Sequence, residues 1–247
     1  MANSIYFKRR AVEPVRCLQE GWNLVKDQYW LFVGMCLVAM LIGSVVPFGI
    51  LLGPMMCGLY LAFFAKRRGQ TVEFELLFKG FDYFGPSLIA TLIHVVPIVA
   101  IIVPAYILFY VGLFMSLAIP GEGGQPNPAF ALGFIGAFLI FWLVVMVVII
   151  VISIGFTFVY PLIVDRGLSG VDAVKMSFKA AMPNFWRLLG LSLLSGVLSV
   201  AGLILCYVGI IFVFPITLSA IAVAYEQVFG PLGSPISNLP PPPPTFK

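Results

Sequence analysis

The sequence contains very little charge. Only 10% of its 247 residues are charged, whereas 61% are hydrophobic. A soluble domain carries about 25% charged residues and fewer than half apolar ones. This composition excludes an ordinary soluble enzyme, a disordered chain and a nucleic-acid-binding domain. Unbroken apolar runs also exclude a β-barrel, whose strands alternate polar and apolar residues. We therefore expect an all-α integral membrane protein.

Three long stretches lack charge almost entirely. They are Trp30–Ala65, Tyr83–Val164, in which Glu122 is the single exception, and Leu188–Tyr225. A charge at the bilayer centre costs about 2.5–3.5 kcal/mol, and a helical span needs about 20 residues. Each stretch is long enough for two spans. The sequence thus predicts six transmembrane helices, at about 29–46, 50–66, 86–118, 129–160, 186–206 and 210–228.

Positive charge is missing from one side of this predicted topology. All 14 Lys and Arg residues fall before the first span, between spans two and three or spans four and five, just inside the adjoining ends of those spans, or in the tail. The positive-inside rule then places both termini in the cytoplasm, and we expect a multi-pass protein of the bacterial inner membrane. The charged N-terminal segment lacks a short apolar region with a cleavage site, so we expect no removable signal peptide.

Groups suited to chemistry are scarce. His94 is the only histidine, and it lies inside the third predicted span. An ionisable residue in a span is a functional hypothesis by default, although a neutral imidazole bonded to a neighbouring helix is the simpler interpretation. The four cysteines show no disulfide or metal spacing. We expect no enzyme, cofactor or metal site.

A pattern recurs along the chain. Residues 11–27 carry apolar residues at helical spacing, which predicts an amphipathic helix on the cytoplasmic membrane surface. The pattern returns 156 positions later, and Pro54 and Gly69 match Pro215 and Gly230 at a spacing of 161. A fainter copy surrounds Leu77. We therefore predict one membrane domain over 1–230. It comprises three parallel repeats, each a surface helix followed by a hairpin, at about 11–69, 71–160 and 168–230.

The middle repeat has unusually long predicted spans. Pro97 and Pro104 allow kinks in the first of them. The second contains no proline between Phe130 and Tyr160, which predicts one continuous helix that ends at Pro161. A turn at 165–167 should follow, with Ser169 capping the next helix.

Basic clusters on the cytoplasmic side could hold anionic lipid headgroups, at about 1 kcal/mol per residue, although setting the topology also explains them. The residues are Arg9, Arg10, Lys66, Arg67 and Arg68. Asp165 and Arg166 are further candidate contacts to lipid or a partner, although a capped surface helix explains all features of that stretch and is the simpler interpretation. The proline-rich tail at 231–247 is predicted to be disordered and cytoplasmic, or alternatively a polyproline ligand for a partner.

Several short motifs resemble a broad group of bacterial six-span inner-membrane proteins of uncharacterised function. These motifs are Gly53–Gly58, Leu77–Phe81 and Pro161–Gly167 with Ala173 and Ser177. Some members of the group are the membrane domain attached to glycerophosphodiester phosphodiesterases. The resemblance covers nearly the whole chain except the tail, and it implies a six-span fold without implying an activity.

The function that these features favour is a non-catalytic scaffold or accessory subunit. Its expected contacts are membrane lipids, a membrane-protein partner or a second copy of the chain, and no nucleic acid. A passive transporter or lipid-handling protein is the alternative, since prolines in the spans can break helices around a cavity. An interfacial enzyme that uses Asp165, Arg166 or His94 is a third hypothesis.

Overall fold

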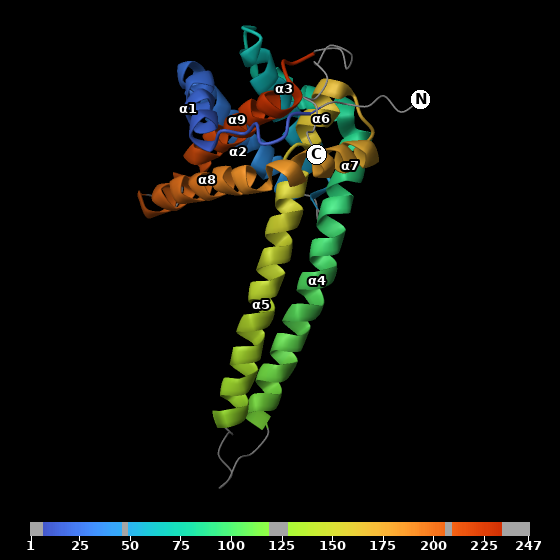
Figure 1. The fold of residues 1–247 in the computed structure, drawn as a ribbon, viewed down its shortest axis with the longest axis vertical. Coiled ribbons are helices and arrows are strands. Elements are labelled where there is room, and N and C mark those ends of the chain that lie inside the picture. The colour runs from blue at the N-terminus through green and yellow to red at the C-terminus, as the bar shows by residue number, and fades with distance from the viewer. Residues whose placement is uncertain (1–6, 46–48, 119–127, 206–208, 234–247) are drawn as a thin grey trace, which may run out of the picture. The chain divides into compact units, whose positions relative to one another are not determined.

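The computed structural model describes residues 7–45, 49–118, 128–205 and 209–233. These residues form helices and loops and contain no strand, which confirms the all-α prediction. The proline-rich tail beyond residue 233 and most of the predicted hairpin turns lie outside the described residues. The α-helices are labelled in Figure 1: α1 (Pro14–Val25), α2 (Tyr29–Val45), α3 (Leu52–Arg67), α4 (Phe84–Ala118), α5 (Pro128–Phe156), α6 (Val159–Arg166), α7 (Gly170–Ala181), α8 (Phe185–Leu205) and α9 (Gly209–Phe229).

Five helical stretches of the described chain are long and apolar enough to cross a membrane. They are Pro14–Val45, Phe74–Met115, Leu132–Arg166, Gly170–Ile204 and Gly209–Phe229. Helix α3 corresponds to the second predicted span and contains 16 residues, slightly fewer than the 17–25 or so that a span requires. A membrane protein with several apolar helices is therefore supported, while the sixth span stays a prediction.

Surface elements precede three of the long helices. Helix α1 leads through the 3₁₀ helix η1 (Lys26–Gln28) into α2, and α7 leads through η5 (Met182–Asn184) into α8. Both α7 and α8 begin 156 positions after α1 and α2. The element before α4 differs, because η3 (Phe74–Tyr83) is a 3₁₀ helix rather than an α-helix.

The prediction of a continuous helix over 129–160 is wrong. Helix α5 ends at Phe156, and α6 begins at Val159 after a turn at Thr157–Phe158. Ser177 of α7 explains the break, because its Oγ accepts a hydrogen bond from the Phe158 N–H (3.1 Å) and donates one to the Gly155 carbonyl (2.5 Å). Pro161 does not end a helix but lies in the first turn of α6, where a missing N–H costs no hydrogen bond.

The predicted cap of α7 is confirmed. Ser169 has an extended backbone, and its Oγ accepts a hydrogen bond from the Asp172 N–H at 3.2 Å. Before it, α6 ends at Arg166 and is followed by Gly167, whose φ of 61° lies in the left-handed region that glycine adopts without strain. Helix α4 continues through Pro97 and Pro104 as a single helix.

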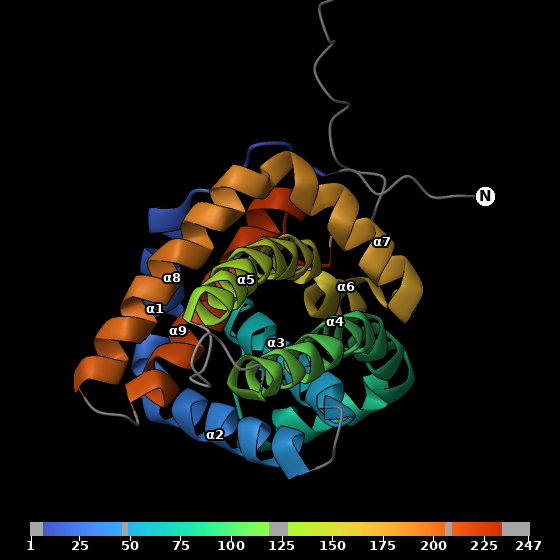
Figure 2. The same ribbon diagram turned by 90° about the horizontal axis from the view of Figure 1, so that it is seen from below.

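The described chain divides into two compact units, one of residues 1–91 and 154–247 and one of Leu92–Ser153. In the first unit, α1 packs on α9 and α8, α8 packs on α9, α2 packs on α3 and α9, and α6 packs on α3 and α7. Figure 2 shows α2 and α8 as neighbours of α3 and α9, respectively. In the described chain, the second unit consists of α4 from Leu92 to its end and of α5 from its start to Ser153.

Three close backbone approaches fix the surface elements of the first unit. A Cβ on Gly21 of α1 would lie 2.8 Å from Ser219 Oγ of α9, and a Cβ on Gly80 of η3 would overlap the Pro54 carbonyl and Gly58 of α3. Ser177 of α7 makes the third approach, through its two hydrogen bonds at the α5–α6 break. Each element thus reaches an inner helix through a glycine or a serine, which leaves the two backbones close together.

Aromatic rings fill the core between the inner helices of this unit. The rings follow one another from α2 through α3 and α9 to the start of α6, with neighbouring centroids 4.9–6.3 Å apart. Such spacings are typical of favourable ring pairs. The residues are Phe32, Phe63, Tyr60, Phe64, Tyr225, Phe229 and Phe158.

The second unit also pairs its helices through aromatic side chains. Phe109 of α4 and Phe138 of α5 have ring centroids 4.3 Å apart, and Tyr106 meets Trp142 at 5.8 Å. Large apolar side chains such as Leu108 cover the exposed faces of both helices. This unit contains no charged residue in its described part, as a lipid-embedded pair of helices requires.

The approach at Gly80 gives a test of the packing. We expect Gly80→Ala to lower the thermal unfolding temperature of the detergent-purified protein, because the added methyl group meets the α3 backbone, and overpacking costs about 1–3 kcal/mol. Gly85→Ala is the matched control, since a Cβ there has nothing within 4 Å. Equal unfolding temperatures of the two variants would show that the approach does not constrain the fold.

Candidate functional site

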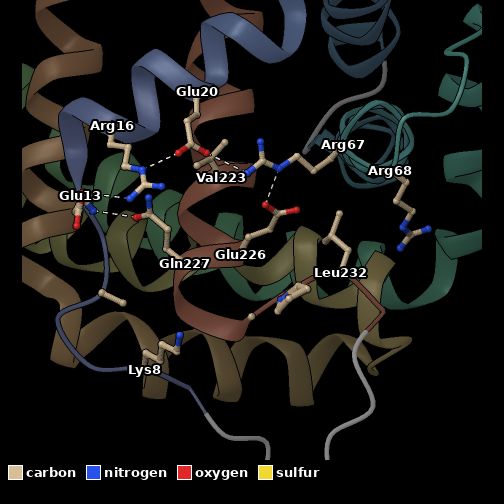
Figure 3. Close-up of a pocket in the computed structure, with 13 residues that line it drawn as sticks. Lys8, Glu13, Arg16, Glu20, Arg67, Arg68, Val223, Glu226, Gln227 and Leu232 are labelled. Carbon is tan, nitrogen blue, oxygen red and sulfur yellow. Dashed lines mark hydrogen bonds and ion pairs between the residues drawn. The ribbon is translucent and has the colours of Figure 1, made fainter. Parts of the chain in front are cut away.

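A pocket of about 630 Å³ lies where α1, the end of α3 and the end of α9 meet the segments before α1 and after α9 (Figure 3). Its lining mixes both signs of charge with amide and apolar groups. The residues are Lys8, Ala11, Glu13, Arg16, Glu20, Arg67, Arg68, Val223, Glu226, Gln227, Gly230, Pro231 and Leu232. All of them belong to the first unit.

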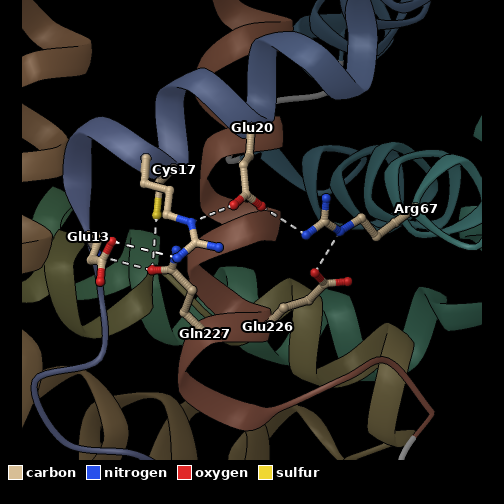
Figure 4. A network of polar contacts seen from close by, with 7 residues as sticks. Glu13, Cys17, Glu20, Arg67, Glu226 and Gln227 are labelled. Atoms are coloured by element: carbon tan, nitrogen blue, oxygen red, sulfur yellow. Dashed lines mark hydrogen bonds and ion pairs between the residues drawn. The ribbon is translucent and has the colours of Figure 1, made fainter.

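Arg67 connects the three helices around this pocket (Figure 4). Its Nε donates to Glu226 Oε2 of α9 at 2.7 Å, and its Nη2 donates to Glu20 Oε2 of α1 at 3.0 Å. The two carboxylates are more buried than the guanidinium, with exposed side-chain fractions of 16% and 26% against 36%. Partial burial strengthens these charge-assisted hydrogen bonds relative to those of fully solvated pairs.

The polar network extends along α1 and into α9. Glu20 also accepts from Arg16 Nε at 2.7 Å, an i,i+4 pair on one helix face. The Gln227 side-chain oxygen accepts from the Glu13 backbone N–H at 2.9 Å and from the Cys17 thiol at 3.3 Å. Gln227 therefore fixes the start of α1, where Pro14 at the first helical position needs no partner.

Asn184 holds the segment that carries Lys8. Its Oδ1 accepts from the Ala11 N–H at 2.9 Å, and its Nδ2 donates to the Lys8 carbonyl at 3.1 Å. The Lys8 N–H also donates to the Val228 carbonyl at 2.8 Å. These backbone hydrogen bonds therefore position Lys8 beside the pocket.

A second polar cluster lies inside the protein next to the pocket. Asp165 Oδ2 accepts from the Tyr225 hydroxyl at 2.7 Å and from Arg166 Nε at 2.9 Å, and its Oδ1 accepts from the Gly233 N–H at 2.9 Å. Arg68 approaches the same carboxylate at 3.7 Å. The Asp165 and Arg166 side chains are only 0% and 6% exposed. Their contacts favour a structural role that ties α6 to the end of α9.

The structure separates the basic residues that the sequence analysis grouped together. Arg67 and Arg68 line the pocket, but Lys66 Nζ donates to Gln28 Oε1 at 3.2 Å instead. Arg9 and Arg10 are exposed on the segment before α1. A role in binding anionic lipid headgroups stays a hypothesis for these residues.

His94 lies in the second unit, on α4, and its side chain is partly buried. Within the described residues no group of three His, Cys, Asp or Glu side chains is placed to hold a metal ion. A functional role for His94 stays a hypothesis.

Sequence reasoning missed most of the pocket. Glu20, Glu226 and Gln227 were not among the candidate residues, although the i,i+4 spacing of Arg16 and Glu20 could have indicated an ion pair on α1. Glu226 and Gln227 show no such signal, because they meet α1 only after the chain has folded.

Both carboxylates near the centre of the pocket are engaged in ion pairs, because Glu20 and Glu226 each accept hydrogen bonds from an arginine. In the described part of the chain, every buried side-chain nitrogen or oxygen atom has a hydrogen-bond partner.

Comparisons of this chain with protein families, with curated proteins and with solved structures give no match.

Removing Arg67 tests its role as the connection between helices. We expect the amides of α1 to exchange with deuterium about tenfold faster in Arg67→Gln, because the partly buried Glu226 loses its ion-pair partner and Glu20 loses one of its two, at a cost of about 1–3 kcal/mol. Mass spectrometry of peptides from α1 measures this change. Arg9→Gln is the control, and α1 exchange that is unchanged in Arg67→Gln would contradict the role.

Proposed function

We propose that this chain is a multi-pass protein of the bacterial inner membrane that acts as a non-catalytic scaffold or accessory subunit. It contacts lipid or a membrane-protein partner, with both termini in the cytoplasm. Five apolar helical stretches and charged surface elements that precede three long helices support the membrane placement.

The docking contacts support three parallel repeats. The surface element of the first repeat, α1, packs on the second helix of the last repeat, α9. In turn, η3 packs on α3, and α7 contacts the α5–α6 break. The surface element of each repeat thus contacts a helix of the preceding repeat, and the surface element of the first repeat contacts the last one. The inner helices α3, α6 and α9 are each followed by a glycine with positive φ, namely Gly69, Gly167 and Gly230.

The aromatic core is the observation that carries the scaffold proposal. Tyr60, Phe63 and Tyr225 are at most 2% exposed, and their rings belong to a continuous series between the inner helices. A transport path needs polar groups or a cavity between helices. A ring-filled core instead gives a rigid support, and it leaves the charged pocket beside α1 as the docking point.

A passive transporter or lipid-handling protein is the alternative. The pocket of about 630 Å³ supports this alternative, because its volume is large enough for a lipid headgroup. A scaffold uses the pocket to hold a partner, whereas a transporter must also move its ligand across the membrane.

The orientation has a direct test. A reporter that is active only in the periplasm should be active when inserted near Gly124, because the positive-inside rule places that loop outside the cytoplasm. The same reporter fused after Lys247 should be inactive. Activity only at the C-terminal fusion would reverse the proposed topology.

The scaffold role predicts that a protein partner or a lipid binds stably to the chain in the membrane. Chain purified from native membranes in mild detergent should retain a stoichiometric protein partner or lipid, identified by mass spectrometry. Arg67→Gln should retain less of it, because the docking surface loses its link to α1, while Arg9→Gln should match the wild type.

Purification of the folded chain without stable protein or lipid would count against the scaffold. Movement of lipid across the bilayer of vesicles that contain the purified chain would support the alternative function instead.

A further inference from the structure

A second pocket, of about 410 Å³, lies at the junction of α1, η1 and α2. Its walls include the rings of Trp22, Tyr29 and Trp30 and the charged side chains of Lys26 and Asp27. This junction is where the amphipathic helix α1 gives way to the apolar helix α2. In a membrane it would therefore lie at the level of the lipid headgroups.

The aromatic walls of this junction pocket are held in place. Trp22 and Tyr29 have ring centroids 5.4 Å apart, and Tyr29 and Trp30 have centroids 5.9 Å apart, both in edge-to-face geometry. The Tyr29 hydroxyl donates to the Phe212 carbonyl at 2.7 Å, which fixes the middle ring from behind. The outer rings remain accessible, since Trp22 is 44% and Trp30 74% exposed.

The charged walls are available for a ligand. Gln28 is engaged, because it donates to the Val72 carbonyl and accepts from Lys66 Nζ. By contrast, Lys26 and Asp27 are exposed, and neither has an ion-pair partner among the described residues. The pocket thus presents a cation and a carboxylate that form no ion pair within the described part of the chain, beside aromatic faces.

Aromatic faces combined with a carboxylate attract an ammonium group through cation–π and ionic contacts. A neighbouring lysine attracts a phosphate. We propose that the junction pocket binds the headgroup of a membrane lipid in which a phosphodiester is linked to an ammonium group. The ammonium lies against Trp22, Trp30 and Asp27, and the phosphate lies at Lys26. This inference rests on the proposed membrane placement and names one lipid class for the scaffold.

The surface of α2 favours a lipid over a soluble ligand. An exposed apolar stripe runs from Trp30 along one face of α2, through residues spaced seven, four and four positions apart. These residues are Leu37, Leu41 and Val45. The stripe leads away from the pocket, so acyl chains of a lipid bound there would lie along it.

The equivalent junction of α7 and α8 provides a natural control within the chain. Phe185 and Trp186 repeat the edge-to-face pair at 5.5 Å, and Trp186 is 80% exposed. Met182 and Pro183 replace Lys26 and Asp27, so this junction has aromatic rings without the two charges. An aromatic pair alone serves as an interfacial anchor, and of these two equivalent junctions the one at η1 adds a lysine and a carboxylate between its helices.

The test uses the full chain, delipidated in an uncharged detergent and titrated with lipids of identical acyl chains. Native mass spectrometry should show phosphatidylcholine or phosphatidylethanolamine bound about tenfold more tightly than phosphatidylglycerol, which lacks the ammonium. Asp27→Asn, which preserves side-chain shape, and Trp30→Ala should each remove most of this preference. Trp186→Ala should leave it intact.

Three results would overturn the proposal. The first is equal binding of phosphatidylglycerol to the wild-type chain. The second is an unchanged preference in folded Asp27→Asn, with folding checked by its unfolding temperature. The third is soluble phosphocholine that competes as strongly as the lipid, because it would remove the role of the α2 stripe. If the chain keeps its protein partner but shows no headgroup preference, only the lipid proposal is contradicted, and the proposed scaffold function is unaffected.

Discussion

The first unit depends on close approach between the surface elements and the inner helices. Gly21 and Gly80 allow this approach because they have no side chain, and a methyl group on either would meet backbone or side-chain atoms of α9 or α3. Ser177 achieves it differently, by replacing a helical hydrogen bond at the α5–α6 break. In an apolar surrounding such contacts are effective, because van der Waals packing and hydrogen bonds, rather than the hydrophobic effect, hold membrane helices together.

Charge has a separate role at the polar ends of the same helices. Arg67 joins Glu20 and Glu226 and so connects three helices through one side chain, while the Asp165 carboxylate gathers Tyr225 and Arg166. Isolated surface ion pairs contribute little. The groups of the Arg67 and Asp165 clusters differ from such isolated pairs, because they are linked to one another, at least partly buried and satisfied by hydrogen bonds. They therefore fix the positions of the helix ends relative to one another, which apolar contacts alone do not specify.

The sequence predicted the all-helical fold and the positions of several helices, because scarcity of charge and helical periodicity are local signals. The expected start of a span at 29 coincides with Tyr29 of α2, and the expected cap at Ser169 is present. The break between α5 and α6 could not be predicted, since it depends on Ser177, which lies 19 residues beyond Phe158. The pocket escaped prediction for the same reason, because Glu226 and Glu20 are far apart in sequence. Lys66 and Arg67 are adjacent in sequence but make contacts with different elements.

The hydrogen bond from the Gly233 N–H to Asp165 fixes the end of the described chain. The carboxylate is buried and anchored by Tyr225 and Arg166, so the chain departs from a fixed point, and Leu232 just before it lines the charged pocket. A buried side chain of α6 thereby holds the backbone at 232–233 beside the charged pocket, so the last described turn of the chain forms part of the pocket wall.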